Sequence, residues 1–498
     1  CQILCWTPIC LNQRIMGKYK NLVVNVALFA INAVATKLIT FFLVPLYTYF
    51  MSAGEYGLTD MSLTVINLIM PLATLDIAES AVRFIVGDRA RSDEYAAITL
   101  GITFISIVLV IFLTPILDFG VFGGLGSYKG WFILAYATSA LMNMCGEVAR
   151  GMERIKFIPV CAGISSLVTL ISAALCIGAA GMGVMGYFVS VSVGPAMAIV
   201  LYLTRGGIGK ASFTGARKII TCPWREIRDL IGPMLRYSLP LIPNSLFWWL
   251  GSGINRIFIT GMLGISASGM FAAASKIPNL LNTAYSVFQQ AWQLSAFQES
   301  GQKGLERFFS TVFTLIQAGM TILCAALSFV APWLAAIFLQ GETYEAWSMI
   351  GILLLSNLFN VFATFYGTVY STTMHTTFIM KTTVFGALAC VIFTPVLIPF
   401  IGTYGACAAS ALGQALVFVM RVLDSRKYLR FDVGWRYLFP TIGLLVVQAL
   451  SAAIQFPHWQ LLAGACFVIV FAIQSIRVVR MIRSSGLSLD VIRKKKKA

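Results

Sequence analysis

Five basic residues lie inside long apolar stretches of this sequence: Lys37, Arg83, Arg150, Arg256 and Lys276. A charge near the centre of a bilayer is costly, so charged residues in membrane-spanning segments tend to face a cavity or the interior of a helix bundle. Cations around one cavity attract a ligand with concentrated negative charge, and a pyrophosphate is such a group. These five residues are therefore the candidate binding site.

Several of these cations have a carboxylate nearby in the sequence. Asp76, Glu79 and Arg83 are spaced i, i+3 and i+7, which predicts one face of a single helix, and Glu79 precedes Arg83 in the favourable i, i+4 order. Glu147 and Arg150 are spaced i, i+3. Arg83 and Arg150 therefore have two interpretations, a structural ion pair and a ligand contact, and Arg150 can also extend towards the membrane surface.

Lys37 and Arg256 have no carboxylate within one helical turn, which makes them the strongest candidates for an anion-binding cavity. Carboxylates inside spans have a second possible role, since a group that binds a proton or Na⁺ better in one state can drive a conformational change. The candidates for such ion coupling are Asp60, Asp76, Glu79 and Glu147. The sequence does not choose among them.

The elements that position these residues are membrane-spanning helices. Hydrophobic residues make up 58% of the 498 residues and charged residues 11%, whereas soluble domains have about 25% charged residues. The apolar runs are continuous and about twenty residues long, which fits helices and not the alternating strands of a membrane barrel. We therefore predict an all-α polytopic membrane protein with about 14 transmembrane helices. They lie near 22–46, 57–83, 96–117, 131–151, 158–179, 186–204, 237–262, 269–295, 309–331, 346–370, 379–400, 404–422, 438–455 and 460–479.

The basic residues predict the orientation of these helices. If both termini are cytoplasmic, 30 of the 36 Lys and Arg residues lie at cytoplasmic margins, and Lys129 alone lies on the opposite side. Such an asymmetry is typical of the positive-inside rule. The largest cytoplasmic segment, residues 205–236, has seven basic residues. It is interpreted either as an amphipathic linker that lies against anionic lipid head groups or as a solvated linker.

Matching glycines divide the chain into two halves. Gly183, Gly186 and Gly194 correspond to Gly402, Gly405 and Gly413 at an offset of 219, and Gly57 corresponds to Gly269. We expect two parallel six-helix lobes with a central cavity and two further helices at the C-terminal end. Residues 1–15, before Met16, are interpreted as an extension that is not native or not ordered, or else as a short segment at the membrane interface. The rest of the predicted organisation is an N-lobe (16–204), the basic linker (205–236), a C-lobe (237–422), helices 13 and 14 (423–480) and a basic tail (481–498).

The sequence has little to support catalysis. It contains no phosphate-binding GxxxxGK[ST] loop, no HExxH and no Gly-Xaa-Ser-Xaa-Gly elbow, and its eleven cysteines have no metal-ligand spacing. We therefore expect no enzyme activity, no cofactor, no metal site and no nucleic-acid partner.

Three stretches carry a resemblance to a known family. They are LVPLYTYFMSAGEYGLTD at 43–60, LDIAESAVRF at 75–84, and the region 237–299 with YSLPLIPN, NRIFITGMLG, FAAASKIPNLL and FQQAWQLSAFQE. The chain resembles the polysaccharide flippases of Wzx type, in the superfamily that also holds MATE drug exporters and lipid II flippases. The resemblance covers nearly all of the chain in layout and about a quarter in motif.

The resemblance implies a fourteen-helix carrier of the bacterial inner membrane. Such a carrier moves undecaprenyl-pyrophosphate-linked oligosaccharide repeat units, for O-antigen (lipopolysaccharide), capsule or exopolysaccharide, by alternating access, and works beside a polysaccharide polymerase and a chain-length regulator. Arg83 and Arg256 match family arginines, and Lys37 and Lys276 match commonly basic positions. The family often has Asp-Arg where this chain has Asn255-Arg256, which implies an Arg256 that is less neutralised.

Two other functions remain open at this point. A lipid II flippase would share the pyrophosphate, and a cation-coupled multidrug exporter would share the fold, although the basic residues inside the spans disfavour cationic drugs. Polar residues within spans can read sugars or join helices by hydrogen bonds. They include Asn67, Asn244, Gln289, Gln290 and Asn357.

Overall fold

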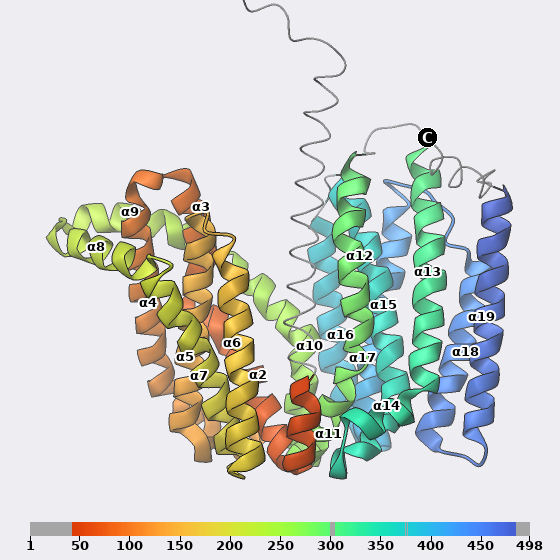
Figure 1. Cartoon of the computed structure of the whole chain (residues 1–498). Coiled ribbons are helices and arrows are strands. Elements are labelled where there is room, and N and C mark those ends of the chain that lie inside the picture. The colour runs from red at the N-terminus through yellow and green to blue at the C-terminus, as the bar shows by residue number, and fades with distance from the viewer. Residues whose placement is uncertain (1–41, 299–303, 374, 376, 485–498) are drawn as a thin grey trace, which may run out of the picture. The chain divides into compact units, whose positions relative to one another are not determined.

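The computed structural model describes residues 42–298, 304–373, 375 and 377–484 (Figure 1). Within those residues the regular structure is entirely helical. Eleven of the described helices are long and apolar enough to cross a membrane. The predicted all-α polytopic fold is therefore confirmed. The first predicted span, near 22–46, lies largely outside the described residues.

The described chain divides into two compact units. The first, unit 1, comprises residues 74–110 and 130–239 together with 42–46. Apolar side chains of α3, α4, α5 and α7 form its core around Ile85, Tyr95, Val148 and Tyr202. Its helices are α3 (Ile77–Gly87), α4 (Ser92–Leu113), α5 (Lys129–Gly151), α6 (Phe157–Ala173), α7 (Gly183–Thr204), α8 (Ile208–Thr221) and α9 (Trp224–Ser238).

Unit 2 comprises residues 47–73, 111–129 and the chain from 240 onward. A cluster of aromatic rings around Trp292, Phe313 and Phe365 packs α12, α13 and α15 together. Its helices are α2 (Ala53–Thr74), α10 (Leu241–Leu263), α11 (Ile265–Lys276), α12 (Asn279–Gln298), α13 (Leu305–Phe329), α14 (Ala331–Phe338), α15 (Trp347–Thr372), α16 (Thr377–Ile401), α17 (Thr403–Ser425), α18 (Trp435–Ile454) and α19 (Trp459–Ser484).

Matching glycines make matching contacts in the two units. A Cβ on Gly194 would lie 2.6 Å from the carbonyl oxygen of Ser165, and a Cβ on Gly413 would lie 3.2 Å from that of Gly386. These glycines let α7 approach α6 and let α17 approach α16. Small residues allow such close approach of helices in membranes. The same packing device therefore recurs in both units.

The turns before these helices also correspond. Gly183 begins α7 with φ 52°, and Gly402 precedes α17 with φ 57°. A left-handed backbone of this kind favours glycine. The spacing of the glycine triplets thus reflects a glycine with positive φ at the start of the helix, followed by a close helix contact.

Two predicted spans are interrupted. The predicted helix 57–83 breaks into α2 and α3 at Leu75 and Asp76, which have φ 56° and 48°. The expectation that Asp76 shares a helical face with Glu79 and Arg83 is therefore wrong, because Asp76 lies outside α3 in the left-handed region. The predicted helix 269–295 breaks between α11 and α12 at Ile277 and Pro278. Proline lacks the N–H that would continue the helix.

The basic linker folds into the two short helices α8 and α9. A Cβ on Gly215 would lie 1.8 Å from the carbonyl oxygen of Asp93, so α8 packs directly on the start of α4. Leu230 and Met234 of α9 are buried in the core of unit 1. The linker is thus a folded part of unit 1, lying at one end of its helices (Figure 1).

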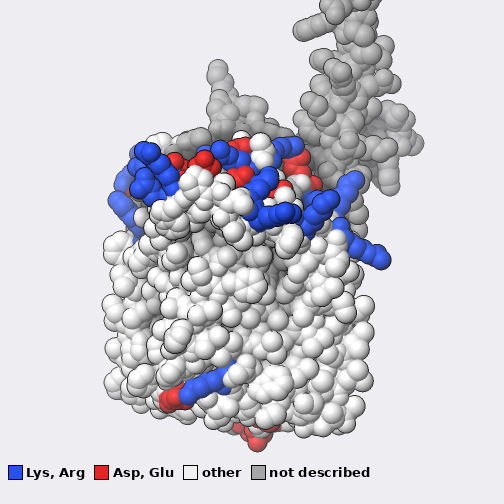
Figure 2. Space-filling model, turned by 90° about the vertical axis from the view of Figure 1, so that its left-hand side faces the viewer, with Lys and Arg blue, Asp and Glu red and all other residues white. Residues whose placement is uncertain are grey.

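Basic side chains concentrate at one end of the face shown in Figure 2, above a broad band without charge. Which end faces the cytoplasm stays a prediction from the sequence. Two arginines assigned to the margins, Arg421 and Arg477, are instead buried, each 6% exposed. Both guanidinium groups donate hydrogen bonds to neighbouring helices, which explains why they lie within the packed helices.

Candidate functional site

One carboxylate in unit 2 joins two of the predicted cations. Asp60 of α2 forms an ion pair with Arg256 of α10, and the Lys276 Nζ of α11 lies 3.4 Å from the other Asp60 oxygen. The Asp60 side chain is 6% exposed, whereas that of Lys276 is 30% exposed. Two cations share one anion, so the cluster keeps a net charge of +1 within the apolar part of the chain.

The pairing corrects the expectation that Arg256 is poorly neutralised. The carboxylate comes from another helix, so the absence of an acidic residue next to Arg256 in the sequence did not reveal it. Arg256 also donates from Nη1 to the Ser252 carbonyl oxygen at 2.9 Å and lies over the Phe271 ring. These contacts hold the guanidinium in one place while leaving it partly accessible.

Asn255 fixes the rotation of α10. Its side-chain amide donates to the Ser410 hydroxyl at 2.6 Å and accepts from the Thr394 hydroxyl at 2.6 Å, and the residue is buried. Successive residues of a helix point about 100° apart. With Asn255 held towards α16 and α17, the following Arg256 is directed towards Asp60.

Close helix contact brings α2 to the same place. Gly57 and Gly269 lie against each other, since a Cβ on Gly57 would be 3.0 Å from the Gly269 nitrogen and 2.3 Å from the Ile265 carbonyl oxygen. Asp60 follows Gly57 by one turn. The Trp249 indole also donates to the Thr64 carbonyl oxygen at 2.9 Å, which ties α10 to α2.

Arg256 opens onto a cavity of about 330 Å³, near the lower end of the size range for small-molecule sites. Its wall is rich in amide and hydroxyl groups. Asn357, a predicted sugar contact, lines it and accepts a hydrogen bond from Asn282 at 3.0 Å. Further lining residues are Trp248, Ser275, Asn279, Ser356, Asn360, Ser410 and Gln414.

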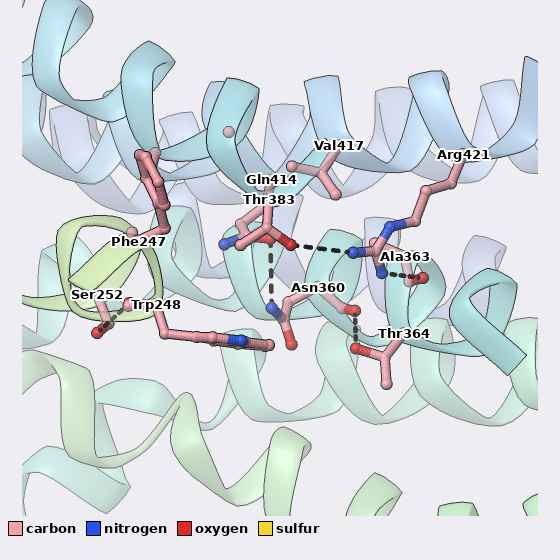
Figure 3. Close-up of a pocket in the computed structure, with 13 residues that line it drawn as sticks. Phe247, Trp248, Ser252, Asn360, Ala363, Thr364, Thr383, Gln414, Val417 and Arg421 are labelled. Carbon is pink, nitrogen blue, oxygen red and sulfur yellow. Dashed lines mark hydrogen bonds between the residues drawn. The ribbon is translucent and has the colours of Figure 1, made fainter. Parts of the chain in front are cut away.

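A second chamber of about 110 Å³ adjoins this cavity (Figure 3). The two share Trp248, Gly251, Ser252, Asn360 and Gln414 as lining residues. The shared residues make the two chambers parts of one polar space.

Arg421 lies at the far side of the second chamber, and the sequence interpretation missed it as a site residue. Its position near the end of a predicted span suggested a marginal residue. Asp424, three residues later, is a possible ion-pair partner within one turn, so no signal in the sequence marked Arg421. Figure 3 shows its guanidinium beside Thr383 and the Ala363 carbonyl group. The space thus has a cation at each end, Arg256 and Arg421.

The remaining charged residues predicted for the site lie in unit 1, apart from Lys37, which is outside the described residues. Arg150 pairs with Glu147 at 2.9 Å, as the spacing predicted. Arg83 is exposed and lies 5.5 Å from the centre of the Tyr237 ring; among the described residues it forms no ion pair with Glu79. Arg83 therefore has the freer guanidinium of the two.

The fold is similar to those of solved membrane transporters. The structure titled lipid II flippase MurJ, inward closed conformation, superposes with a TM-score of 0.65 at 13% identity over 92% of this chain and 99% of that chain. An inward-facing MATE multidrug resistance transporter gives 0.62 at 16% identity over 80% and 97%. A MOP superfamily transporter from Pyrococcus furiosus gives 0.56 at 16% identity over 81% and 94%.

These identities are low, so the similarity establishes the shared fold. No curated protein sequence matches this chain significantly. The family model described as polysaccharide biosynthesis protein matches residues 22–292, which include Asp60, Arg256 and Lys276 and more than half of the chain. The chain therefore belongs to the polysaccharide biosynthesis protein family.

Proposed function

We propose that this protein is a flippase that moves undecaprenyl-pyrophosphate-linked oligosaccharide repeat units from the cytoplasmic to the periplasmic leaflet of the bacterial inner membrane. The observation that carries the proposal is the cluster of Arg256 and Lys276 on Asp60. It supplies net positive charge beside a cavity lined by amides and hydroxyls. The family match and the transporter fold support the same function.

The cluster suits a pyrophosphate because its cations are held but incompletely neutralised. Arg256 uses Nε for Asp60 and one Nη1 hydrogen for Ser252, which leaves further N–H donors for phosphate oxygens. Lys276 adds an ammonium group at the opposite oxygen of Asp60. Charge-assisted hydrogen bonds to phosphate are about twice as strong as neutral ones. Asp60 keeps the cations in position when the site is empty.

The other cations belong to the same proposal. Lys37, Arg83 and Arg150 would guide the pyrophosphate or complete its binding site, with Lys37 expected to matter most. Asp60, Asp76, Glu79 and Glu147 stay candidates for ion coupling, and Asp60 is favoured because it touches the cations that would bind the cargo. Both termini would be cytoplasmic, and the lipid tail would stay in the bilayer.

The amide-lined wall is the expected place for the sugars. Alternating access would expose it first to the cytoplasm and then to the periplasm, where a polysaccharide polymerase and a chain-length regulator would act on the product. The surface polysaccharide served can be O-antigen, capsule or exopolysaccharide. No step of bond making or breaking is needed for this transport, so the proposal includes no enzyme activity.

A proteoliposome assay tests the proposal against its alternatives. The purified full chain is reconstituted with fluorescent undecaprenyl-pyrophosphate glycan, and dithionite quenching reports which leaflet holds the label. With the wild type, we expect dithionite to quench label from both leaflets. With Arg256→Gln it should quench only the label in the outer leaflet, and with Arg256→Lys the quenched fraction should be intermediate. Arg426→Gln is the control, because Arg426 is exposed on the same unit outside the cavity.

The same vesicles separate the cargoes. Preference for lipid II over the oligosaccharide lipid would assign the protein to peptidoglycan precursor transport, and transport of ethidium without either glycolipid would assign it to drug export. Unchanged flipping by Arg256→Gln would contradict the proposed site. In cells, neutralising Lys37 or Arg256 is expected to abolish surface polysaccharide without lowering protein abundance.

A further inference from the structure

Arg421 carries a buried charge that no carboxylate neutralises among the described residues. It is 6% exposed, and its partners are uncharged. Nε donates to the Thr382 hydroxyl at 3.0 Å, Nη1 to the Ala363 carbonyl oxygen at 2.8 Å, and Nη2 to the Thr383 hydroxyl at 3.4 Å. A buried cation without a counter-ion is costly, so such a residue inside a span marks a functional site.

The guanidinium retains donors for a ligand. It has five N–H groups, and the three contacts leave one hydrogen on each Nη nitrogen. A single carboxylate can accept from both Nη nitrogens of one guanidinium group. Arg421 lines the second chamber, where a ligand can reach this end of the group (Figure 3).

The middle of the chamber offers groups suited to sugar hydroxyls. Asn360 Nδ2 donates to Gln414 Oε1 at 3.2 Å, which orients both amides. The remaining Asn360 oxygen can accept a hydrogen bond, and the Gln414 NH₂ group can donate one. Sugar hydroxyls bind to groups of both kinds.

Trp248 supplies a flat apolar surface at the other side. Its side chain is 57% exposed and lines both chambers. The ring face is negative, and the C–H bonds on one face of a pyranose carry weak positive charge, so the two pack favourably. In Figure 3 the Asn360–Gln414 pair lies between Trp248 and Arg421.

We propose that the chamber between Trp248 and Arg421 binds an acidic sugar of the cargo glycan, with the sugar's carboxylate on Arg421. The inference rests on the proposed flippase function and specifies its cargo as a uronate-containing repeat unit. It separates two anion sites: Arg256 and Lys276 bind the pyrophosphate, and Arg421 binds the sugar carboxylate. Asn360 and Gln414 bind hydroxyls between them.

The test measures binding to the purified full chain in detergent, using saturation-transfer NMR for free glucuronate and glucose and isothermal titration calorimetry for inorganic pyrophosphate. We expect glucuronate to bind at least tenfold more tightly than glucose. Arg421→Gln should lower glucuronate affinity to the level of glucose and leave pyrophosphate affinity unchanged, while Arg421→Lys should retain part of the preference. Arg426→Gln should change nothing.

Arg421→Gln removes three internal hydrogen bonds. A second variant therefore tests the sugar site without depending on the folding of Arg421→Gln. Trp248→Ala removes an exposed ring and should weaken both sugars at least fivefold with an unchanged melting temperature. Trp333→Ala is its control, since Trp333 is similarly exposed on α14.

Equal affinity for glucuronate and glucose would overturn the inference, as would unchanged sugar binding in Arg421→Gln or Trp248→Ala. Loss of pyrophosphate binding in Arg421→Gln would also overturn it, by assigning Arg421 to the pyrophosphate. Failure of the wild type to bind pyrophosphate would instead count against the proposed function.

Discussion

The carboxylate of Asp60 is paired with the guanidinium of Arg256, which lies 196 residues later in the chain. The pair joins α2 to α10 within unit 2, and Lys276 of α11 completes it. One buried anion therefore holds two cations in place. The arrangement explains how a positive site can persist in an apolar region without a bound ligand.

Breaking this pair from either side is expected to show coupling between the two residues. Asp60→Asn should destabilise the protein strongly because it leaves two cations without a carboxylate. The double variant Asp60→Asn/Arg256→Gln should be less destabilised than the sum of the single variants, with a coupling free energy of about 1–3 kcal/mol. Unfolding in mixed detergent–SDS micelles measures it.

The exposed pair of Lys129 and Asp118, 2.5 Å apart, provides the control for that cycle. Exposed ion pairs contribute about 0–1 kcal/mol, so the matching cycle should show little coupling. Equal coupling in the two cycles, or additive effects of Asp60→Asn and Arg256→Gln, would contradict a buried structural pair.

A carboxylate at position 255 is expected not to replace Asp60. The Asn255 side chain is held by Ser410 and Thr394, on the side of α10 away from Asp60. Asp60→Asn/Asn255→Asp should therefore be no more stable than Asp60→Asn alone, as judged by thermal unfolding. Recovery of wild-type stability in the double variant would show that residue 255 can reach Arg256.

The contact between α2 and α11 is expected to tolerate no side chain at Gly57 or at Gly269. Gly57→Ala and Gly269→Ala would each place a methyl group within 2.3 Å of a backbone oxygen, and overpacking of this kind costs about 1–3 kcal/mol. Gly319→Ala is the matched control, because nothing lies within 4 Å of its Cβ position in α13. Its stability should be equal or higher. Equal melting temperatures for all three variants would contradict the tight contact.

The α8–α9 segment is expected to bind anionic lipid. Phe213 and Ile220 lie seven residues apart on α8 and are 75% and 84% exposed, with Arg217 and Lys218 between them. Exposed apolar and basic side chains on one short helix suit a membrane interface. Arg217→Gln/Lys218→Gln should reduce co-purified phosphatidylglycerol relative to phosphatidylethanolamine in lipid mass spectrometry. An unchanged ratio would indicate a solvated segment.

Much of the fold follows from patterns within single segments. Apolar run length predicted the helices. The glycine spacing predicted two repeated halves, and the structure adds that these glycines make matching contacts in α6–α7 and α16–α17. The breaks at Asp76 and Pro278 were missed because hydropathy averages over many residues, whereas a helix break depends on one or two backbone conformations. Proline at 278 was a usable signal, and Asp76 gave none.

The site was less predictable because its contacts join distant segments. Sequence spacing found the Glu147–Arg150 pair, which lies within one helix turn, but not the Asp60–Arg256 pair, which depends on helix packing. Arg421 was assigned to the margin from its distance along the helix. Its burial arises from the close approach of α15 and α16. The residue pattern of α17 alone does not predict this packing.

The most direct measurement of the central claim is native mass spectrometry of the purified full chain with undecaprenyl pyrophosphate and undecaprenyl monophosphate in competition. The wild type should retain the pyrophosphate lipid in preference. Arg256→Gln should lose at least tenfold in affinity for the pyrophosphate lipid and little for the monophosphate lipid, while Arg426→Gln should match the wild type. Retention of the full pyrophosphate preference by Arg256→Gln would contradict the account.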